Sequence, residues 1–169
     1  MDNKEKAIEI YELIENGDIA QAKEIIITDK SLLDFVTPFG TWLHVAARAG
    51  KLDMIKFLVE SGMDININEG VPKSAPIVHA ASEGEISIVG YLFDNGAILD
   101  VSDPNRNPLF SAIYGGYLDI VKYLVQNGID ITVKYTGDTM KDMGAYEFAI
   151  ERGQTEIAEY LKIKMGEKE

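Results

Sequence analysis

The stretch LDMIKFLVESGMDI (52–65) reappears 66 residues later as LDIVKYLVQNGIDI (118–131), with eight of the fourteen positions identical. A third version, ISIVGYLFDNGAIL (86–99), lies between the two. Self-similarity with a period of about 20 to 50 residues indicates units that stack on one another. The repeated stretch therefore predicts a fold that is built from copies of one structural unit.

Glycines recur along the chain with the same period, in two series. The first series consists of Gly17, Gly50, Gly84, Gly116 and Gly153, at spacings of 33, 34, 32 and 37 residues. The second series consists of Gly62, Gly96 and Gly128, each twelve residues after one of the first. Both series stand where we expect a helix to end, because glycine closes a helix in the left-handed conformation without a steric penalty.

The segments between the glycines have the apolar pattern of helices. Leu52, Ile55 and Leu58 fall at positions i, i+3 and i+6, on one face of a helix. A shorter helix is predicted before each later glycine of the first series, and Pro76 and Pro108 suit the first turn of two of them. Each unit is therefore predicted to contain a short helix, a turn, a longer helix and a loop.

This organisation resembles the ankyrin repeat. The segment TWLHVAA (41–47) is similar to the family's T-P-L-H-x-A-A, with Trp42 in place of proline. Residues 50–66 and 116–132 are similar to its G-x-L-x-I-V-x-x-L-L-x-x-G-A-D-x-N segment. The resemblance covers nearly the whole chain and implies an all-α solenoid of stacked helix-turn-helix units with projecting hairpin-like loops. It implies a single domain over residues 1–169, with units near 4–36, 37–69, 70–102, 103–135 and 136–169.

Polar residues at both ends of the chain indicate terminal units. An array exposes the outer faces of its first and last units, so these faces must be polar. In KEKAIEIYELIENGD, Ala7 and Ile10 belong to an inward apolar stripe, and Lys4 and Glu9 to an outer polar face. Lys162 stands where the earlier units have an apolar residue. These features predict polar caps and an array that both begins and ends within the chain.

Composition and charge exclude several classes of partner. The chain contains no cysteine. Its net charge is −12, so a phosphate backbone would be repelled and we expect no nucleic-acid partner. It contains no run of about 18 apolar residues, and its N-terminus lacks the apolar core of a signal peptide. We therefore expect a cytoplasmic monomer that makes no contact with membranes.

No sequence motif indicates catalysis, a cofactor or a metal. The two histidines, His44 and His79, have no serine or cysteine nucleophile motif beside them. His44 occupies the histidine position of the ankyrin motif, which implies hydrogen bonding between neighbouring loops. The segment DININEG (64–70) lacks the glycine and the bidentate glutamate of a calcium loop. An enzyme or a metal-binding protein is the remote alternative, because it would require a buried titratable cluster that the sequence does not reveal.

The resemblance implies a concave binding surface formed by the loop tips and by the exposed face of the short helices. The candidate contacts in and beside the loops are Thr37, Phe39, Trp42, Val71, Asp103, Arg106, Met140 and Lys141. The candidates on the short helices are Arg48, Ser82, Glu83, Tyr114 and Arg152. Aromatic and arginine side chains are the usual anchors of protein interfaces. For Trp42, bracing of a loop is an equally good interpretation.

These observations together predict a non-catalytic protein–protein interaction module. The acidity favours a partner with a basic surface through electrostatic steering, although solubility alone also explains the charge. The small size and the acidity suggest an alternative, a dedicated inhibitor or immunity protein that sequesters a basic enzyme or toxin. The segment KYTGDTMKDM (134–143) contains the extra residues of the last glycine spacing. It predicts an enlarged loop, which either takes part in binding or is a tolerated insertion.

Overall fold

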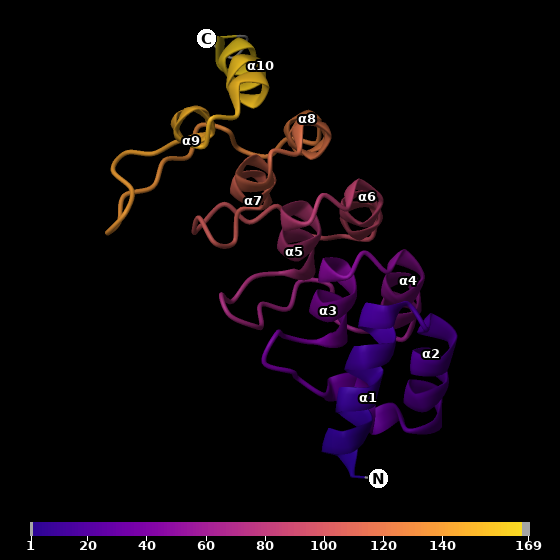
Figure 1. Cartoon of the computed structure of the whole chain (residues 1–169). Coiled ribbons are helices and arrows are strands. Elements are labelled where there is room, and N and C mark those ends of the chain that lie inside the picture. Colours follow the sequence, from indigo (N-terminus) through magenta and orange to yellow (C-terminus); the bar gives the residue numbers. More distant parts are fainter. Residues whose placement is uncertain (1, 167–169) are drawn as a thin grey trace.

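The computed structural model describes residues 2–166, and in this part of the chain it shows ten α-helices, one short 3₁₀ helix and no strands (Figure 1). The helices pack in five consecutive pairs. The pairs stack in one direction, so that the N- and C-termini lie at opposite ends of the stack (Figure 1). The predicted all-α solenoid is confirmed.

The stack contains two rows of helices. The first row consists of α1 (Asn3–Asn16), α3 (Trp42–Arg48), α5 (Pro76–Ser82), α7 (Pro108–Gly115) and α9 (Ala145–Glu151). The second row consists of α2 (Ile19–Thr28), α4 (Leu52–Glu60), α6 (Ile86–Asp94), α8 (Leu118–Gln126) and α10 (Thr155–Gly166). The 3₁₀ helix η1 (Lys30–Asp34) follows α2. The loops that precede α5, α7 and α9 project from the first row, on the side away from the second row (Figure 1).

The core lies between the two rows, and equivalent residues of successive units build it. From the second unit onward, each first-row helix contributes a fully buried alanine, and each second-row helix a fully buried leucine. These residues are Ala46, Ala80, Ala112 and Ala149, and Leu58, Leu92, Leu124 and Leu161. The small alanine side chains allow neighbouring helices to approach closely, and the leucines fill the space between the rows. Truncating such a leucine to alanine typically costs about 2–5 kcal/mol of unfolding free energy.

The ends of the stack are polar as predicted, but apolar side chains also remain exposed there. Ala7 and Ile10 are buried in α1, and Lys162 is exposed on α10. Ile8 and Ile163 are nevertheless 53% and 60% exposed. Each end of the described chain therefore combines charged and apolar surface.

Hydrogen bonds through His44 connect neighbouring loops. Its Nδ1 accepts a hydrogen bond from the backbone N–H of Thr41 at 3.1 Å, which leaves the proton on Nε2. Nε2 then donates to the carbonyl oxygen of Ser74, in the loop of the next unit, at 2.8 Å. The bridging role that the ankyrin resemblance implied for His44 is confirmed.

Tyr135 plays a similar part further along the stack. Its hydroxyl donates to the carbonyl oxygen of Val101 at 2.8 Å and accepts a hydrogen bond from Asn107 Nδ2 at 2.9 Å. Its ring packs edge-on against Phe110, with 5.0 Å between the centroids. The projecting loops are therefore held to one another as well as to their own helices.

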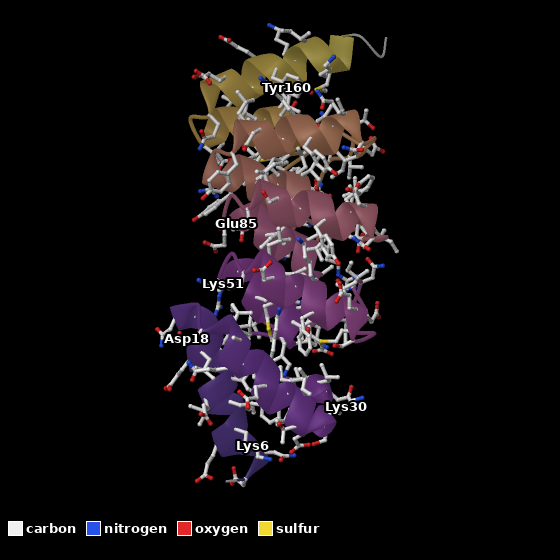
Figure 2. The ribbon with its side chains drawn as sticks, turned by 90° about the vertical axis from the view of Figure 1, so that its right-hand side faces the viewer. Lys6, Asp18, Lys30, Lys51, Glu85 and Tyr160 are labelled. Atoms are coloured by element: carbon white, nitrogen blue, oxygen red, sulfur yellow. The ribbon has the colours of Figure 1, made fainter. Side chains whose placement is uncertain are left out.

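Side chains also link the units at the turns between paired helices. From the second unit onward, the residue that precedes each second-row helix covers a glycine of the unit before it. The pairs are Lys51 with Gly17, Glu85 with Gly50, Tyr117 with Gly84, and Gln154 with Gly116. Figure 2 shows Asp18, Lys51 and Glu85 in a column along one edge of the second row. Each of these glycines therefore marks a point of close approach between two units.

Gly84 and Gly153 show what this close approach requires. Both have positive φ angles, of 80° and 70°. A Cβ atom on Gly84 would lie 2.6 Å from Cε1 of Tyr117, whereas a Cβ on Gly153 would meet nothing within 4 Å. Gly84 is therefore required by its conformation and by its neighbour, and Gly153 by its conformation alone.

These two glycines form a matched pair for measuring the contact between units. Both Gly84→Ala and Gly153→Ala place a side chain in the left-handed region, at a cost of about 1–2 kcal/mol. Only Gly84→Ala also forces Tyr117 to move, so we expect it to lose about 1–3 kcal/mol more unfolding free energy in urea titrations. The difference should shrink in a Tyr117→Ala background. Equal losses in the two variants would show that this contact does not constrain the stack.

Candidate functional site

A groove of about 850 Å³ runs along the side of the first row that bears the loops. Its floor comes from α5, α7 and α9, and its walls come from the loops around residues 71–74, 102–105 and 134–140. Seven of the thirteen residues that the sequence suggested as partner contacts line this groove. They are Arg48, Val71, Ser82, Asp103, Tyr114, Met140 and Arg152. Residues from four units thus meet in one continuous surface.

A second, smaller hollow of about 370 Å³ lies where α1 meets the loop before α3. Thr37 and Phe39 line it, together with Ile8 and Tyr11. Phe39 is 45% exposed, whereas Thr37 is 9% exposed and its hydroxyl donates to the carbonyl oxygen of Gly40 at 2.8 Å. Thr37 therefore mainly closes the turn of its own loop.

The remaining candidates line neither hollow. Glu83 and Lys141 are exposed, and Arg106 lies 3.9 Å from the carboxylate of Asp100. Nothing in the arrangement of these three side chains connects them with the groove.

The suggestion that Trp42 contacts a partner is wrong. Its side chain is fully buried, and its Nε1 donates to the carbonyl oxygen of Leu32 at 2.7 Å. Its ring stacks on that of Phe35, with 6.1 Å between the centroids. Trp42 braces η1 against α3, which was the competing interpretation of this residue. The sequence did not reveal η1, and η1 and the residue that follows it provide these contacts.

Arg48 lines the groove and contacts two residues of the smaller hollow. Its guanidinium lies 4.4 Å from the centroid of the Phe39 ring. Nη2 donates to the Tyr11 hydroxyl at 3.0 Å and to Oε1 of Glu15 at 3.3 Å. The rings of Tyr11 and Phe39 are themselves stacked, 5.6 Å apart. Arg48 is therefore held by an aromatic ring, a hydroxyl and a carboxylate of its own chain.

Arg152, at the other end of the groove, is also stacked on aromatic rings. Its guanidinium carbon lies 4.8 Å from the ring centroid of Tyr114 and 5.1 Å from that of Phe148. Phe148 in turn stacks on Phe110 at 4.8 Å. Tyr114 is 63% exposed, as expected for a residue on the solvent-facing side of its helix. The stack presents an aromatic and cationic surface to the groove.

Among the residues that line the groove, cationic side chains outnumber carboxylates, whereas the whole chain is acidic. Its cationic residues are Arg48, Lys134 and Arg152, and its one carboxylate is that of Asp103. Lys134 lies 3.2 Å from Asp142 and 3.8 Å from Glu147. The hydrogen bond to Asp142 is the main cause of the raised pKa of Lys134. The acidic excess of the chain therefore lies outside the groove.

Ser74 and His79 form the one arrangement in the groove that resembles catalytic machinery. The Ser74 hydroxyl lies 3.2 Å from Nε2 of His79, a spacing that a nucleophile and its base can adopt. Ser74, however, is 2% exposed, and its carbonyl oxygen is held by His44. A substrate would not reach this hydroxyl, so the pair is best explained as support for the loop. Among residues 2–166, no group of three or more His, Cys, Asp or Glu side chains is placed to hold a metal ion.

Some groove residues were missed from the sequence. Phe148 and His79 lie on first-row helices, and Lys134 and Tyr135 at the base of the last loop. The helical period places His79 beside residues of the groove, but in the sequence His79 was considered only as a possible catalytic residue. Phe148 carried no signal, because a buried phenylalanine in a short helix is usually part of the core.

A comparison with known families agrees with this architecture. The sequence model described as ankyrin repeats in three copies matches residues 43–135, which is more than half of the chain. The chain belongs to the ankyrin-repeat family. Ankyrin repeats in general are non-catalytic modules that mediate protein–protein interaction.

Several curated proteins match parts of this ankyrin-repeat chain. It is 30% identical over 108 residues to the palmitoyltransferase AKR1 of Lachancea kluyveri, which is 60% of this chain and 14% of that protein. It is 27% identical over 113 residues to ankyrin repeat and SAM domain-containing protein 6 of Rattus norvegicus, covering 66% and 13% of the two chains. It is 30% identical over 90 residues to ankyrin repeat and SOCS box protein 6 of Mus musculus, covering 52% and 22%. The chain therefore spans less than a quarter of the length of these relatives. None of the helices described for it is both long and apolar enough to cross a membrane.

His79 gives the ankyrin-repeat chain a predicted pH dependence. Burial, followed by the nearby His44 and Arg48, lowers the pKa of His79 from 6.5 to about 4. As the pH falls below about 6.5, the unfolded chain takes up a proton that folded His79 does not, so stability is full above that pH and declines toward pH 4.

Through His79, the unfolding free energy should fall by about 1 kcal/mol between pH 7.5 and pH 5.5, because its slope against pH approaches about 1.4 kcal/mol per pH unit. The unfolding free energy of the His79→Gln variant, measured by urea titration, should change correspondingly less over this pH range. His44, whose pKa is also lowered by burial, remains in both proteins and provides the common background. Identical pH profiles would show that His79 is solvated.

Proposed function

We propose that this ankyrin-repeat chain is a non-catalytic binding module that holds an extended segment of a partner protein in the groove. The observation that carries the proposal is the stack of exposed Arg152 on exposed Tyr114 and buried Phe148, within a groove built by four units. Stable interfaces usually depend on a few aromatic and arginine anchors in a well-formed hollow. Because the chain covers only a small part of its relatives, none of their activities is assigned to it.

We further propose that the surface of the partner around the bound segment is basic. The net charge of −12 and the position of the acidic side chains outside the groove support this. Such a field accelerates the encounter with a positive surface and acts over about a Debye length. Steering and anchoring would then involve different parts of the surface, so each can be tested separately.

Tyr114→Ala tests the anchor. For a partner captured from the native lysate and then purified, we expect the variant to dissociate about 5 to 30 times faster, a loss of about 1–2 kcal/mol. The association rate of the unmodified chain should fall as salt is raised to about 0.5 M. Ile163→Ala is the control, because Ile163 is 60% exposed and does not line the groove. An unchanged dissociation rate for Tyr114→Ala would remove this anchor, and association that is independent of salt would refute a basic partner surface.

The last loop provides a second test of the groove. Backbone hydrogen bonds pair Tyr135 with Met143, and Gly137 N donates to Met140 O, so residues 134–143 form the predicted enlarged loop as a hairpin. Its tip brings Thr139 and Met140 to the groove.

Deletion of residues 138–141 should retain the base of the hairpin and change the unfolding free energy by less than about 1 kcal/mol, because loop length has a weak effect. It should lower the affinity for the partner several-fold by removing part of the groove wall. Calorimetry on the purified complex measures this effect. Full affinity after the deletion would identify the extra residues as a tolerated insertion.

A further inference from the structure

We propose that Arg152 binds the side-chain carboxylate of a glutamate or aspartate in the partner segment, and that the groove thereby selects segments with an acidic residue at this point. The inference rests on the proposed function, and it specifies the chemistry at one position of the bound segment. It concerns a local contact only and does not require the partner as a whole to be acidic.

The first observation is the state of the Arg152 side chain. Its guanidinium is stacked near two aromatic rings, 4.8 Å and 5.1 Å from their centroids. Among residues 2–166, no carboxylate forms an ion pair with it and no hydrogen bond engages it. A stacked guanidinium keeps its five N–H donors in the plane of the group, where a carboxylate can accept two of them in parallel. The rings thus restrict the arginine and leave its donors free.

The second observation is that the chain already contains the completed version of this arrangement. Arg48, at the other end of the same groove, lies over the ring of Phe39 and donates to the carboxylate of Glu15 and the hydroxyl of Tyr11. Both arginines stand at the C-terminal end of a first-row helix. Arg152 has the aromatic support that Arg48 has, but within the described chain it lacks the acceptor that Glu15 supplies. A carboxylate from the partner would complete it.

The charges around the groove favour a carboxylate over a phosphate group. The other two cations of the lining, Arg48 and Lys134, already have carboxylate partners, so Arg152 is the cation with unused capacity. A phosphate group carries about −1.5 to −2 charges, and the chain as a whole carries −12. The long-range field therefore opposes a dianion more strongly than a single carboxylate.

The test is a selection of peptides on the intact chain. A library of random twelve-residue peptides, displayed with both ends fused so that no free terminal carboxylate is present, is selected for binding. Peptides that lose binding to Tyr114→Ala are kept as groove binders. We expect them to share a glutamate or aspartate at one position. Replacing this residue by glutamine or asparagine should weaken binding at least about ten-fold, as expected for a charge-assisted bidentate contact.

The matching variants are made in the chain. Arg152→Gln should weaken the same peptides about ten-fold, and Arg152→Lys should recover only part of the loss because lysine lacks the planar fork. Combining Arg152→Gln with the peptide change should weaken binding no further than either change alone. Lys162→Gln is the control, because it removes one positive charge from an exposed position outside the groove and should leave the affinity unchanged.

The outcomes separate this inference from the proposed function. Groove-binding peptides without a shared acidic residue, or with affinities that Arg152→Gln does not change, would overturn the inference and leave the binding groove in place. A selection that produces no groove-binding peptide would count against both. If a peptide with phosphoserine at the shared position bound more than about ten-fold more tightly than one with glutamate, the inferred ligand of Arg152 would be a phosphate group rather than a carboxylate.

Discussion

The whole structure depends on the contact between one helix pair and the next. A single pair has an apolar side that it cannot bury alone, and in this chain the neighbouring units cover it. From the second unit onward, each first-row helix contributes a fully buried alanine and each second-row helix a fully buried leucine. Polar links reinforce the contact between units, from His44 to Ser74 and from Tyr135 to Val101. Stability therefore builds up from unit to unit along one axis, as in other repeat proteins.

The groove is a consequence of this stacking. Each unit contributes a short helix and a loop in the same orientation, so side chains from four units line one groove. No single unit forms the groove alone, and the stack of Arg152 on Tyr114 joins two neighbouring units. The constraints that hold the loops together, such as the bridge through His44, therefore also shape the groove.

The two arginines show how a repeated scaffold comes to carry unlike sites. Arg48 is satisfied by Glu15 and Tyr11 from the first unit. Arg152 is supported by rings but has no carboxylate partner in the described chain. The backbone arrangement is similar at both ends of the groove, and the difference lies in which residues the neighbouring units provide. Function in such a fold depends on these local differences, because the fold by itself does not specify a partner.

The sequence by itself determined the helix pairs and, through the ankyrin resemblance, the side of the stack on which the groove lies. Periodic apolar residues, helix-ending glycines and the prolines at 76 and 108 influence only the backbone within a few residues of them. The helices that they specify can therefore be predicted from the sequence. Seven of the thirteen contacts suggested through the ankyrin resemblance lie in the groove. Only the tertiary structure decided which of these side chains are available. Trp42 is buried because η1 and the residue after it, more than six positions upstream, pack over it, and Arg48 is occupied because Glu15 comes from another unit. Contacts between distant residues depend on how the units meet in space, and no local pattern in the chain records that geometry.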